Sequence, residues 1–266
     1  MSVLVAILII IAIYLFMVAP RMWNKPDRKP FFGVHYAHRG LFNNETDAPE
    51  NSLKAIRKAV ESGYGIEFDV QLSKDDVPVV FHDASLKRMC GIDGNVWGYT
   101  LEELQNMKLA HSEETIPTLA QVLEVVGGKV PLIIEYKMDR ADTKVCELGN
   151  QVLQSYQGVY CIESFHPLAV QWYCKNRPDV MRGQLSENYA RHGKKKLILW
   201  VMTNLLTNFL TRPDFIAFKH QDADGFARRV CKMLGALSVA WTIQSKEEYE
   251  QAKGQFELFI FDSFIL

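Results

Sequence analysis

The chain has 266 residues, with 30 Lys and Arg against 31 Asp and Glu and a formal net charge of -1. Hydrophobic residues make up 48% of it, which excludes a disordered chain, because disorder requires a low apolar content. The balanced charge argues against a nucleic-acid-binding protein, which usually carries a basic excess. The length fits one large domain, since α/β barrels use about 250 residues without dividing.

The first 20 residues indicate a membrane anchor. They contain no charged side chain and approach the length of about 20 apolar residues that a spanning helix needs. Basic residues only follow this run, at Arg21, Lys25, Arg28 and Lys29. Because such residues favour the cytoplasmic side, we expect a single-pass protein of the cell membrane with its following domain in the cytoplasm. A cleaved signal peptide is the alternative, but no basic segment precedes the run and no A-x-A site follows it.

The cysteines agree with a reducing compartment. They are odd in number, widely spaced and free of any CxxC pair, so they predict neither a zinc site nor a disulfide framework. The five are Cys90, Cys146, Cys161, Cys174 and Cys231.

After a short linker at residues 21–33, strand-like runs alternate with helical patterns through a domain at 34–266. The expected strands are 35–38, 65–70, 132–137, 159–165, 181–185, 214–219, 237–243 and 258–261. Eight such units predict a TIM (β/α)8 barrel, an α/β fold, with an open doubly wound sheet as the alternative. Residues 77–83 follow the second strand too closely for a crossover helix. We therefore expect them to form an antiparallel hairpin extension.

Helix starts are marked by capping residues. Asn51 or Ser52 opens the first helix of the domain, which is expected to stop at Gly63. Three further starts have the pattern of a capping box: Thr100 with Glu103, Thr118 with Gln121, and Ser245 with Glu248.

Acidic side chains gather at the C-terminal ends of neighbouring strands, where barrel enzymes hold their active sites. Glu67 and Asp69 have the i, i+2 spacing that places both on one face of a strand, and Glu135 belongs to the next strand. Three converging carboxylates offer hard oxygen ligands to a divalent metal, Mg²⁺ or Ca²⁺. A salt-bridge network in which Arg39 and Lys137 neutralise the carboxylates is the alternative.

Two histidines, His38 and His82, end strand-like runs beside this cluster. Imidazole titrates near neutral pH, so two of them placed across a phosphate can act as general base and general acid. A cation, an arginine and a lysine would neutralise charge on the phosphoryl oxygens. The combination indicates cleavage of a phosphodiester, without deciding which histidine is the base.

These residues lie in ordered segments that resemble the glycerophosphodiester phosphodiesterase family. The segments are His38-Arg39-Gly40, Pro49-Glu50-Asn51-Ser52, Ile66-Glu67-Phe68-Asp69-Val70, Val79-Val80-Phe81-His82-Asp83, Ile116-Pro117-Thr118-Leu119 and Ile134-Glu135-Tyr136-Lys137. The resemblance spans about residues 34 to 262 and is specific because six motifs occur in order. It implies a TIM barrel that hydrolyses glycerophosphodiesters to glycerol 3-phosphate and an alcohol, in lipid metabolism.

The resemblance also implies a role for each matched residue. It matches Glu67, Asp69 and Glu135 to the divalent-metal ligands, His38 and His82 to the acid/base pair, Arg39 and Lys137 to the phosphate contacts, and Phe165 and Trp241 to the substrate-lining aromatics. Residues 84–116 match a short insertion that would cover the site, and we expect His111 there to be a surface residue. Gln244 and the ending at residues 261–264 depart from the family pattern, and these departures concern substrate contacts more than the reaction.

One further segment is unusual. Lys194, Lys195 and Lys196 precede an apolar run at residues 197–210 that is too short to span a membrane. We expect the run to be buried against the barrel, with contact to anionic lipid headgroups as the alternative. Lys219 and His220, at the end of the sixth strand, could contact the alcohol of the substrate.

Two other functions fit the sequence. A lysophospholipase D-like enzyme would act on membrane lysolipids, and a catalytically inactive module would only bind glycerophosphodiesters. Cleavage of a lysolipid would identify the first, and a lack of turnover at saturating metal would identify the second. The sequence leaves open the released alcohol, the choice between Mg²⁺ and Ca²⁺, and the oligomeric state.

Overall fold

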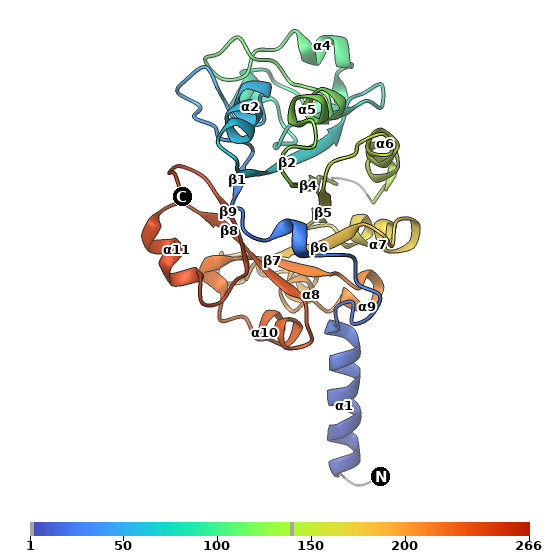
Figure 1. The fold of residues 1–266 in the computed structure, drawn as a ribbon. Helices are drawn as coiled ribbons and strands as arrows, with labels where there is room; N and C mark the ends of the chain where they lie inside the picture. The colour runs from blue at the N-terminus through green and yellow to red at the C-terminus, as the bar shows by residue number, and fades with distance from the viewer. Residues whose placement is uncertain (1–2, 139–140) are drawn as a thin grey trace.

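The computed structural model describes residues 3–138 and 141–266. Its main feature is a closed barrel of eight parallel strands, in the order β1-β9-β8-β7-β6-β5-β4-β2, which pairing of β1 with β2 completes (Figure 1). The strands are β1 (Tyr36–His38), β2 (Gly65–Leu72), β4 (Leu132–Tyr136), β5 (Tyr160–Ser164), β6 (Met181–Ser186), β7 (Phe215–Lys219), β8 (Leu237–Ile243) and β9 (Leu258–Phe261). The structure thus confirms the predicted TIM barrel and excludes the alternative, an open sheet.

Helices surround the strands and cover the apolar outer face of the barrel. They are α2 (Leu53–Glu61), α5 (Leu119–Val126), α6 (Lys144–Leu153), α7 (Pro167–Asn176), α8 (Leu197–Thr203), α9 (Asn208–Thr211), η3 (His220–Asp222), α10 (Phe226–Met233) and α11 (Lys246–Ala252). The largest hydrophobic cluster joins helix residues such as Ile56 and Val122 to strand residues such as Phe68 and Ile134. A smaller cluster fills the inside of the barrel.

The predicted hairpin extension is present. The short strand β3 (Pro78–Val80) pairs antiparallel with β2, with Val80 opposite Val70. The chain continues through α3 (Lys87–Cys90), η2 (Val96–Gly98) and α4 (Leu101–Gln105). This segment has its own hydrophobic cluster, separate from those of the barrel: Val79, Phe81, Leu86, Met89, Val96, Leu104, Met107, Leu109 and Ile116. His111 lies on its surface, as expected.

Side-chain caps start several helices where the sequence predicted them. Thr100 and Thr118 form complete capping boxes with Glu103 and Gln121. Of the two candidates for the start of α2, Ser52 is the cap, because its Oγ accepts from the backbone N–H of Ala55. Ser245 caps α11 alone, since the Glu248 carboxylate accepts from the N–H of Gln244 instead.

The prediction of a membrane-spanning anchor over residues 1–20 is wrong. Residues 1 and 2 lie outside the described part of the chain, and the helix α1 (Val3–Val18) has 16 residues, about 24 Å at 1.5 Å per residue. No helix in the part of the chain that the structure describes is long and apolar enough to cross a bilayer. The predicted single-pass membrane location, with a cytoplasmic domain, is overturned by this finding.

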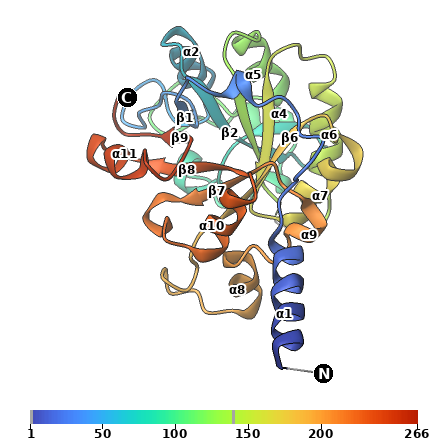
Figure 2. The ribbon, with the colours of Figure 1, turned by 60° about the horizontal axis from the view of Figure 1, so that its bottom comes forward.

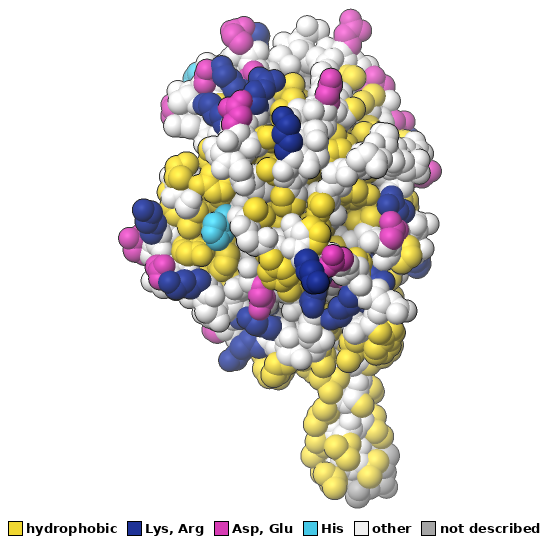
Figure 3. Space-filling model, viewed as in Figure 1, with side chains coloured by type: hydrophobic (Ala, Val, Ile, Leu, Met, Phe, Trp, Pro, Cys, Tyr) yellow, Lys and Arg dark blue, Asp and Glu magenta, His cyan; other side chains and the backbone are white. Residues whose placement is uncertain are grey.

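The helix α1 stops because its last turn packs on the barrel domain. Val18 is buried, and its carbonyl accepts from Asn208 Nδ2 at 2.9 Å. Arg212 donates to the carbonyl of Ala19 at 2.8 Å, and Pro20 follows. The rest of α1 projects from the molecule and carries mainly hydrophobic side chains (Figure 3). Counting apolar residues could not show that the final turn belongs to the domain.

Residues after α1 run across the bottom of the barrel. The side chain of Phe31, in η1 (Lys29–Phe31), is 3% exposed and joins the cluster inside the barrel. Tyr36 donates its hydroxyl to the carbonyl of Phe31 at 2.9 Å. Lys25 and Arg28 both donate to the carbonyl of Gly235. The N-terminal face is therefore closed by this segment, which leaves the opposite face for a site.

Candidate active site

The structure brings together the three carboxylates predicted to hold a metal. Glu67 and Asp69 lie on β2, and Glu135 lies on β4 directly opposite Asp69 in the strand pairing. One oxygen from each lies within 4.8 Å of the others, and all three side chains are buried. Because i, i+2 side chains share a face of the strand, β2 alone supplies two of these groups at the barrel mouth.

Two cations accompany the carboxylates. Lys137 Nζ lies 2.7 Å from Glu135 and 3.0 Å from Asp69. Arg39 Nε lies 3.6 Å from Asp69, and the backbone N–H of Arg39 donates to Glu67 at 3.3 Å. Burial raises the pKa of Asp69, but the nearby charges of Lys137, His82 and Arg39 outweigh it and lower the pKa below its usual range.

A fourth carboxylate, missed by the sequence analysis, makes the cluster more acidic. Glu163 on β5 is paired with Glu135 in the sheet and is 1% exposed. Burial, followed by the charge of Glu135, raises the pKa of Glu163 well above its ordinary value. The sequence did contain a signal for Glu163, because it is an acidic residue within an apolar strand next to β4. A buried carboxylate needs either a charged partner or a proton.

The donor set fits a divalent metal. Arg39 and Lys137 are two positive charges facing Glu67, Asp69 and Glu135, and Arg39 also pairs with Glu50 at 2.7 Å. Burial and the charges of Asp69 and Glu135 raise the pKa of Glu67 well above its usual value, and burial raises that of Glu135 to about 7. A hard cation would relieve this repulsion and satisfy the oxygens. The salt bridges predicted as an alternative are also present, but they do not offset the burial of Glu67 and Glu135, whose pKa values stay raised.

His38, at the end of β1, is held by a carboxylate. Its Nδ1 lies 2.7 Å from Asp262 Oδ2, and its Nε2 lies 3.9 Å from Glu67. Burial lowers the pKa of His38, and the hydrogen bond to Asp262 offsets part of this shift. Burial raises the pKa of Asp262, but the hydrogen bond and charge of His38 outweigh it and lower the pKa to about 2. An ionised Asp262 fixes the tautomer with the proton on Nδ1, so Nε2 is free to accept a proton. Asp262 lies in the C-terminal segment that departs from the family pattern, and sequence reasoning gave it no role.

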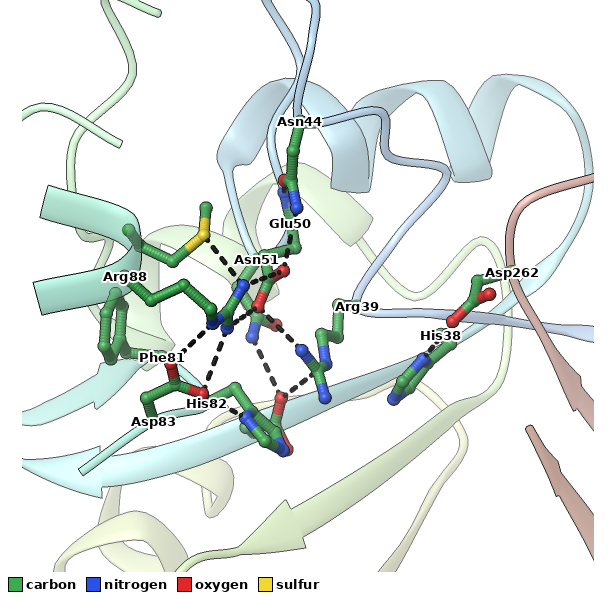
Figure 4. Close-up of polar contacts among 12 residues, drawn as sticks. His38, Arg39, Asn44, Glu50, Asn51, Phe81, His82, Asp83, Arg88 and Asp262 are labelled. Atoms are coloured by element: carbon green, nitrogen blue, oxygen red, sulfur yellow. Dashed lines mark hydrogen bonds and ion pairs between the residues drawn. The ribbon is translucent and has the colours of Figure 1, made fainter. Parts of the chain in front are cut away.

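His82, after β3, has a matching arrangement. Its Nδ1 lies 2.6 Å from Asp83 Oδ1. Burial lowers the pKa of His82, while the charge of Asp69 raises it. Both histidines therefore present Nε2, and Figure 4 shows Arg39 between them. Each can accept or donate a proton once a substrate phosphate lies beside Arg39.

A chain of ion pairs connects Arg39 to His82 through Arg88, a residue of α3 that the sequence analysis did not single out (Figure 4). Arg88 binds Glu50 through two nitrogens at 2.8 and 2.7 Å, and Asp83 at 2.6 and 3.0 Å. Burial raises the pKa of Glu50, but hydrogen bonds from Arg88 outweigh it and lower the pKa to about 2; that of Asp83 is lowered to about 2 in the same way. Arg88 thus holds the partners of both Arg39 and His82.

Replacing Arg88 with methionine is expected to lower the free energy of unfolding by about 1–2 kcal/mol at neutral pH, because the side chain is only partly buried. Since Glu50 and Asp83 have folded pKa values near 2, below their ordinary 4.5 and 3.8, this stabilisation is present above about pH 4.5 and lost towards pH 2. Urea unfolding at several pH values measures it. Lys87→Met, which removes a surface pair with Asp93, is the control and should change little; a pH-independent loss for Arg88→Met would contradict the explanation.

The loop between β1 and α2 shapes the site. Asn51 has a positive φ of 59° and donates through Nδ2 to Asp69 at 2.9 Å, so it holds a carboxylate of the cluster rather than capping α2. Gly40 has a φ of +82°, and a Cβ there would lie 2.8 Å from the backbone of Ala55. This close approach explains why a glycine follows His38 and Arg39.

The two predicted aromatics contact each other. Phe165 and Trp241 pack edge to face with ring centroids 5.4 Å apart, and Phe165 lines a cleft that also reaches His82. Lys219 and His220 are instead engaged by carboxylates: Lys219 lies 3.6 Å from Glu187, and His220 lies 3.4 Å from Glu248. The structure therefore gives the suggested contact of these two residues with the alcohol no support.

The closed barrel with acidic and histidine side chains at its mouth has the architecture of a hydrolase of phosphate diesters. The chain belongs to the glycerophosphoryl diester phosphodiesterase family, whose model matches residues 38–259. It is similar to a glycerophosphodiester phosphodiesterase of Caldanaerobacter subterraneus subsp. tengcongensis, with 28% identity over 81% of this chain and 87% of the relative. It also resembles one from Bacillus altitudinis, with 42% identity over 54% of this chain and 63% of that protein.

Solved structures agree with the fold. A glycerophosphodiester phosphodiesterase from Thermotoga maritima superposes with a TM-score of 0.65 at 26% identity, covering 86% of this chain and 94% of the other. An Oleispira antarctica phosphodiesterase, solved with its product sn-glycerol 3-phosphate, gives 0.71 at 24% identity, covering 87% and 93%. The family and its relatives support the predicted enzyme class, hydrolysis of glycerophosphodiesters.

Proposed function

We propose that the protein hydrolyses glycerophosphodiesters to glycerol 3-phosphate and an alcohol, with a divalent metal and two histidines. The observation that carries the proposal is the pair of carboxylate-held histidines, His38 with Asp262 and His82 with Asp83, on either side of Arg39. The product named for the Oleispira antarctica structure supports the same substrate class. A role in lipid metabolism follows from that class.

The reaction breaks the bond between phosphorus and the alcohol oxygen. One histidine accepts a proton through Nε2 from the attacking oxygen, which belongs to a glycerol hydroxyl or to water. The other histidine donates a proton to the departing alkoxide, so no free alkoxide forms. Attack by a glycerol hydroxyl gives a cyclic phosphate, which water then opens with the two histidines in exchanged roles. Arg39 and Lys137 bind the phosphoryl oxygens, and their positive charge stabilises the charge that develops there.

Glu67, Asp69 and Glu135 would hold the metal, either Mg²⁺ or Ca²⁺. Bound there, it would act as a Lewis acid towards a phosphoryl oxygen. A bound phosphate would attract Lys137 and Arg39 and so weaken their ion pairs with the carboxylates. The metal would then supply the positive charge that the carboxylates lose. Phe165 and Trp241 would form the wall against the non-reacting part of the substrate.

The inactive binding module is the less favoured function. A protein that only binds would not need two histidines with fixed tautomers facing one acidic cluster. Both acid/base groups and both phosphate-binding cations are present at the site.

The test is release of glycerol 3-phosphate from a panel of glycerophosphodiesters by the full-length protein, with Mg²⁺, with Ca²⁺ or with EDTA. We expect turnover with at least one metal and none with EDTA, because the Lewis acid that would polarise the phosphoryl group is then missing. Turnover unaffected by EDTA would contradict the role of the metal. A lack of turnover under every condition would favour a module that only binds glycerophosphodiesters.

A further inference from the structure

The helix α8 exposes apolar side chains beside the candidate active site. Leu197, Ile198 and Trp200 are 79, 60 and 57% exposed, so the expectation that this run is buried against the barrel is wrong for the first turn. Figure 2 shows α8 at the edge of the molecule, away from the barrel strands. A helix that is apolar on all sides is normally covered, and a contiguous exposed apolar patch usually marks a binding site.

The inner end of α8 is fixed to the barrel mouth. Ser186, the last residue of β6, donates its hydroxyl to the carbonyl of Met202 at 2.9 Å. Thr203 donates its hydroxyl to the carbonyl of Glu187 at 3.0 Å, and Met202 is buried. These contacts hold one face of the helix towards the site while its first turn stays uncovered.

A cleft of about 450 Å³ connects the catalytic groups to this helix. Its polar end contains His82, Glu135 and Lys137, and its apolar end contains Ile198, Leu199 and Met202. Phe165 and Tyr189 also line it and add no charge. The cleft therefore matches a molecule that carries a phosphate at one end and a hydrocarbon chain at the other.

We propose that this cleft binds the acyl chain of a lysophospholipid, so that the substrate class includes glycerophosphodiesters with one acyl chain on the glycerol. The proposal rests on the proposed function, because the phosphodiester must lie at Arg39 and Lys137 for the chain to reach α8. A substrate without a chain would leave Ile198 and Leu199 facing water. The continuity of one cleft from the catalytic histidine to the helix selects a chain joined to the substrate as the occupant.

The experiment measures choline release by the full-length protein from glycerophosphocholine and from lysophosphatidylcholines of increasing chain length, each below its critical micelle concentration. We expect kcat/KM to rise with each added methylene, by up to about fourfold, until the apolar end of the cleft is filled. Ile198→Gln should lower the ratio of kcat/KM for the lysolipid to that for glycerophosphocholine by about tenfold. Ile198 is suited to this change because its exposure lets glutamine reach water without unfolding the helix.

Leu197→Gln is the matched control, because Leu197 lies on the same helix, is more exposed and does not line the cleft. It should leave the ratio unchanged. If Leu197→Gln and Trp200→Gln lower the ratio as much as Ile198→Gln, the outer face of α8 binds lipid and the cleft proposal is overturned. A ratio that does not rise with chain length overturns it as well, while glycerophosphocholine cleavage would still support the proposed function.

If neither substrate releases choline, the proposed function fails. The proposal that the cleft binds an acyl chain is then tested by measuring binding. Calorimetry with the same lysophosphatidylcholines and the wild-type protein then measures affinity, because no turnover interferes. Affinity that rises with chain length and falls in Ile198→Gln but not in Leu197→Gln would support the cleft. Affinity independent of chain length would overturn it.

Discussion

Replacing either His38 or His82 with alanine is expected to lower kcat by about 10²–10⁴-fold, because general acid/base catalysis contributes a factor of that size. Each imidazole is held through Nδ1 by its own aspartate, so alanine removes a positioned Nε2 that no neighbour replaces. The double variant should lose little more than either single variant, since both groups act in the same proton transfer sequence. The measurement is kcat at saturating substrate and metal.

The control for the histidines is His111→Ala, because His111 is an exposed histidine of the insertion. It should keep full activity. Thermal unfolding of His38→Ala and His82→Ala separates a catalytic loss from a folding loss. Near wild-type kcat in either variant would remove that histidine from the proposed mechanism.

Changing Glu67 to glutamine is expected to have opposite effects on stability and activity. Without metal the variant should be at least as stable as the wild type, because burial and the charges of Asp69 and Glu135 raise the pKa of Glu67 and make its ionised form costly. Activity with saturating Mg²⁺ or Ca²⁺ should fall by about 10²-fold or more, since one metal ligand is lost. Added metal should raise the melting temperature of the wild type and raise that of the variant much less.

Glu113→Gln is the matched control for this experiment, because Glu113 is almost fully exposed. It should respond to metal as the wild type does. The result that would favour a purely structural salt-bridge network is a Glu67→Gln protein with full activity and a wild-type response to metal. Thermal unfolding with and without EDTA, together with kcat, gives both readings from the same samples.

The barrel could be predicted because its strands are short apolar runs separated by capped helices. The runs ending at His38 and starting at Leu237 lie within one residue of the observed β1 and β8. The N-terminal helix could not be predicted from composition, because its end depends on contacts of Val18 and Ala19 with residues about 190 positions later. Leu197 and Ile198 were wrongly expected to be buried, because here the tertiary contacts that the hydrophobic run suggested are absent among the described residues. Hydrophobicity alone does not show whether a helix has a partner.

The site residues recognised in the sequence are those that lie in strand-end motifs, such as Glu67 and His82. Those missed act through tertiary contacts. Asp262 meets His38 across 224 positions, and Arg88 meets Glu50 across 38. Asp83 directly follows His82 in its motif, so the aspartate that holds this histidine was visible in the sequence but was given no role.

The two histidines lie beside different hydrophobic clusters. His38 ends a barrel strand, whereas His82 follows β3, next to Phe81 in the cluster formed by β3 and the segment after it. Proteins open locally in cooperative parts, and parts with few buried apolar contacts open more easily than a large core. Opening of the smaller core would carry His82, Asp83 and Arg88 away while the eight-stranded barrel stayed folded. We therefore expect activity to be lost at a lower temperature or denaturant concentration than the one that unfolds the barrel.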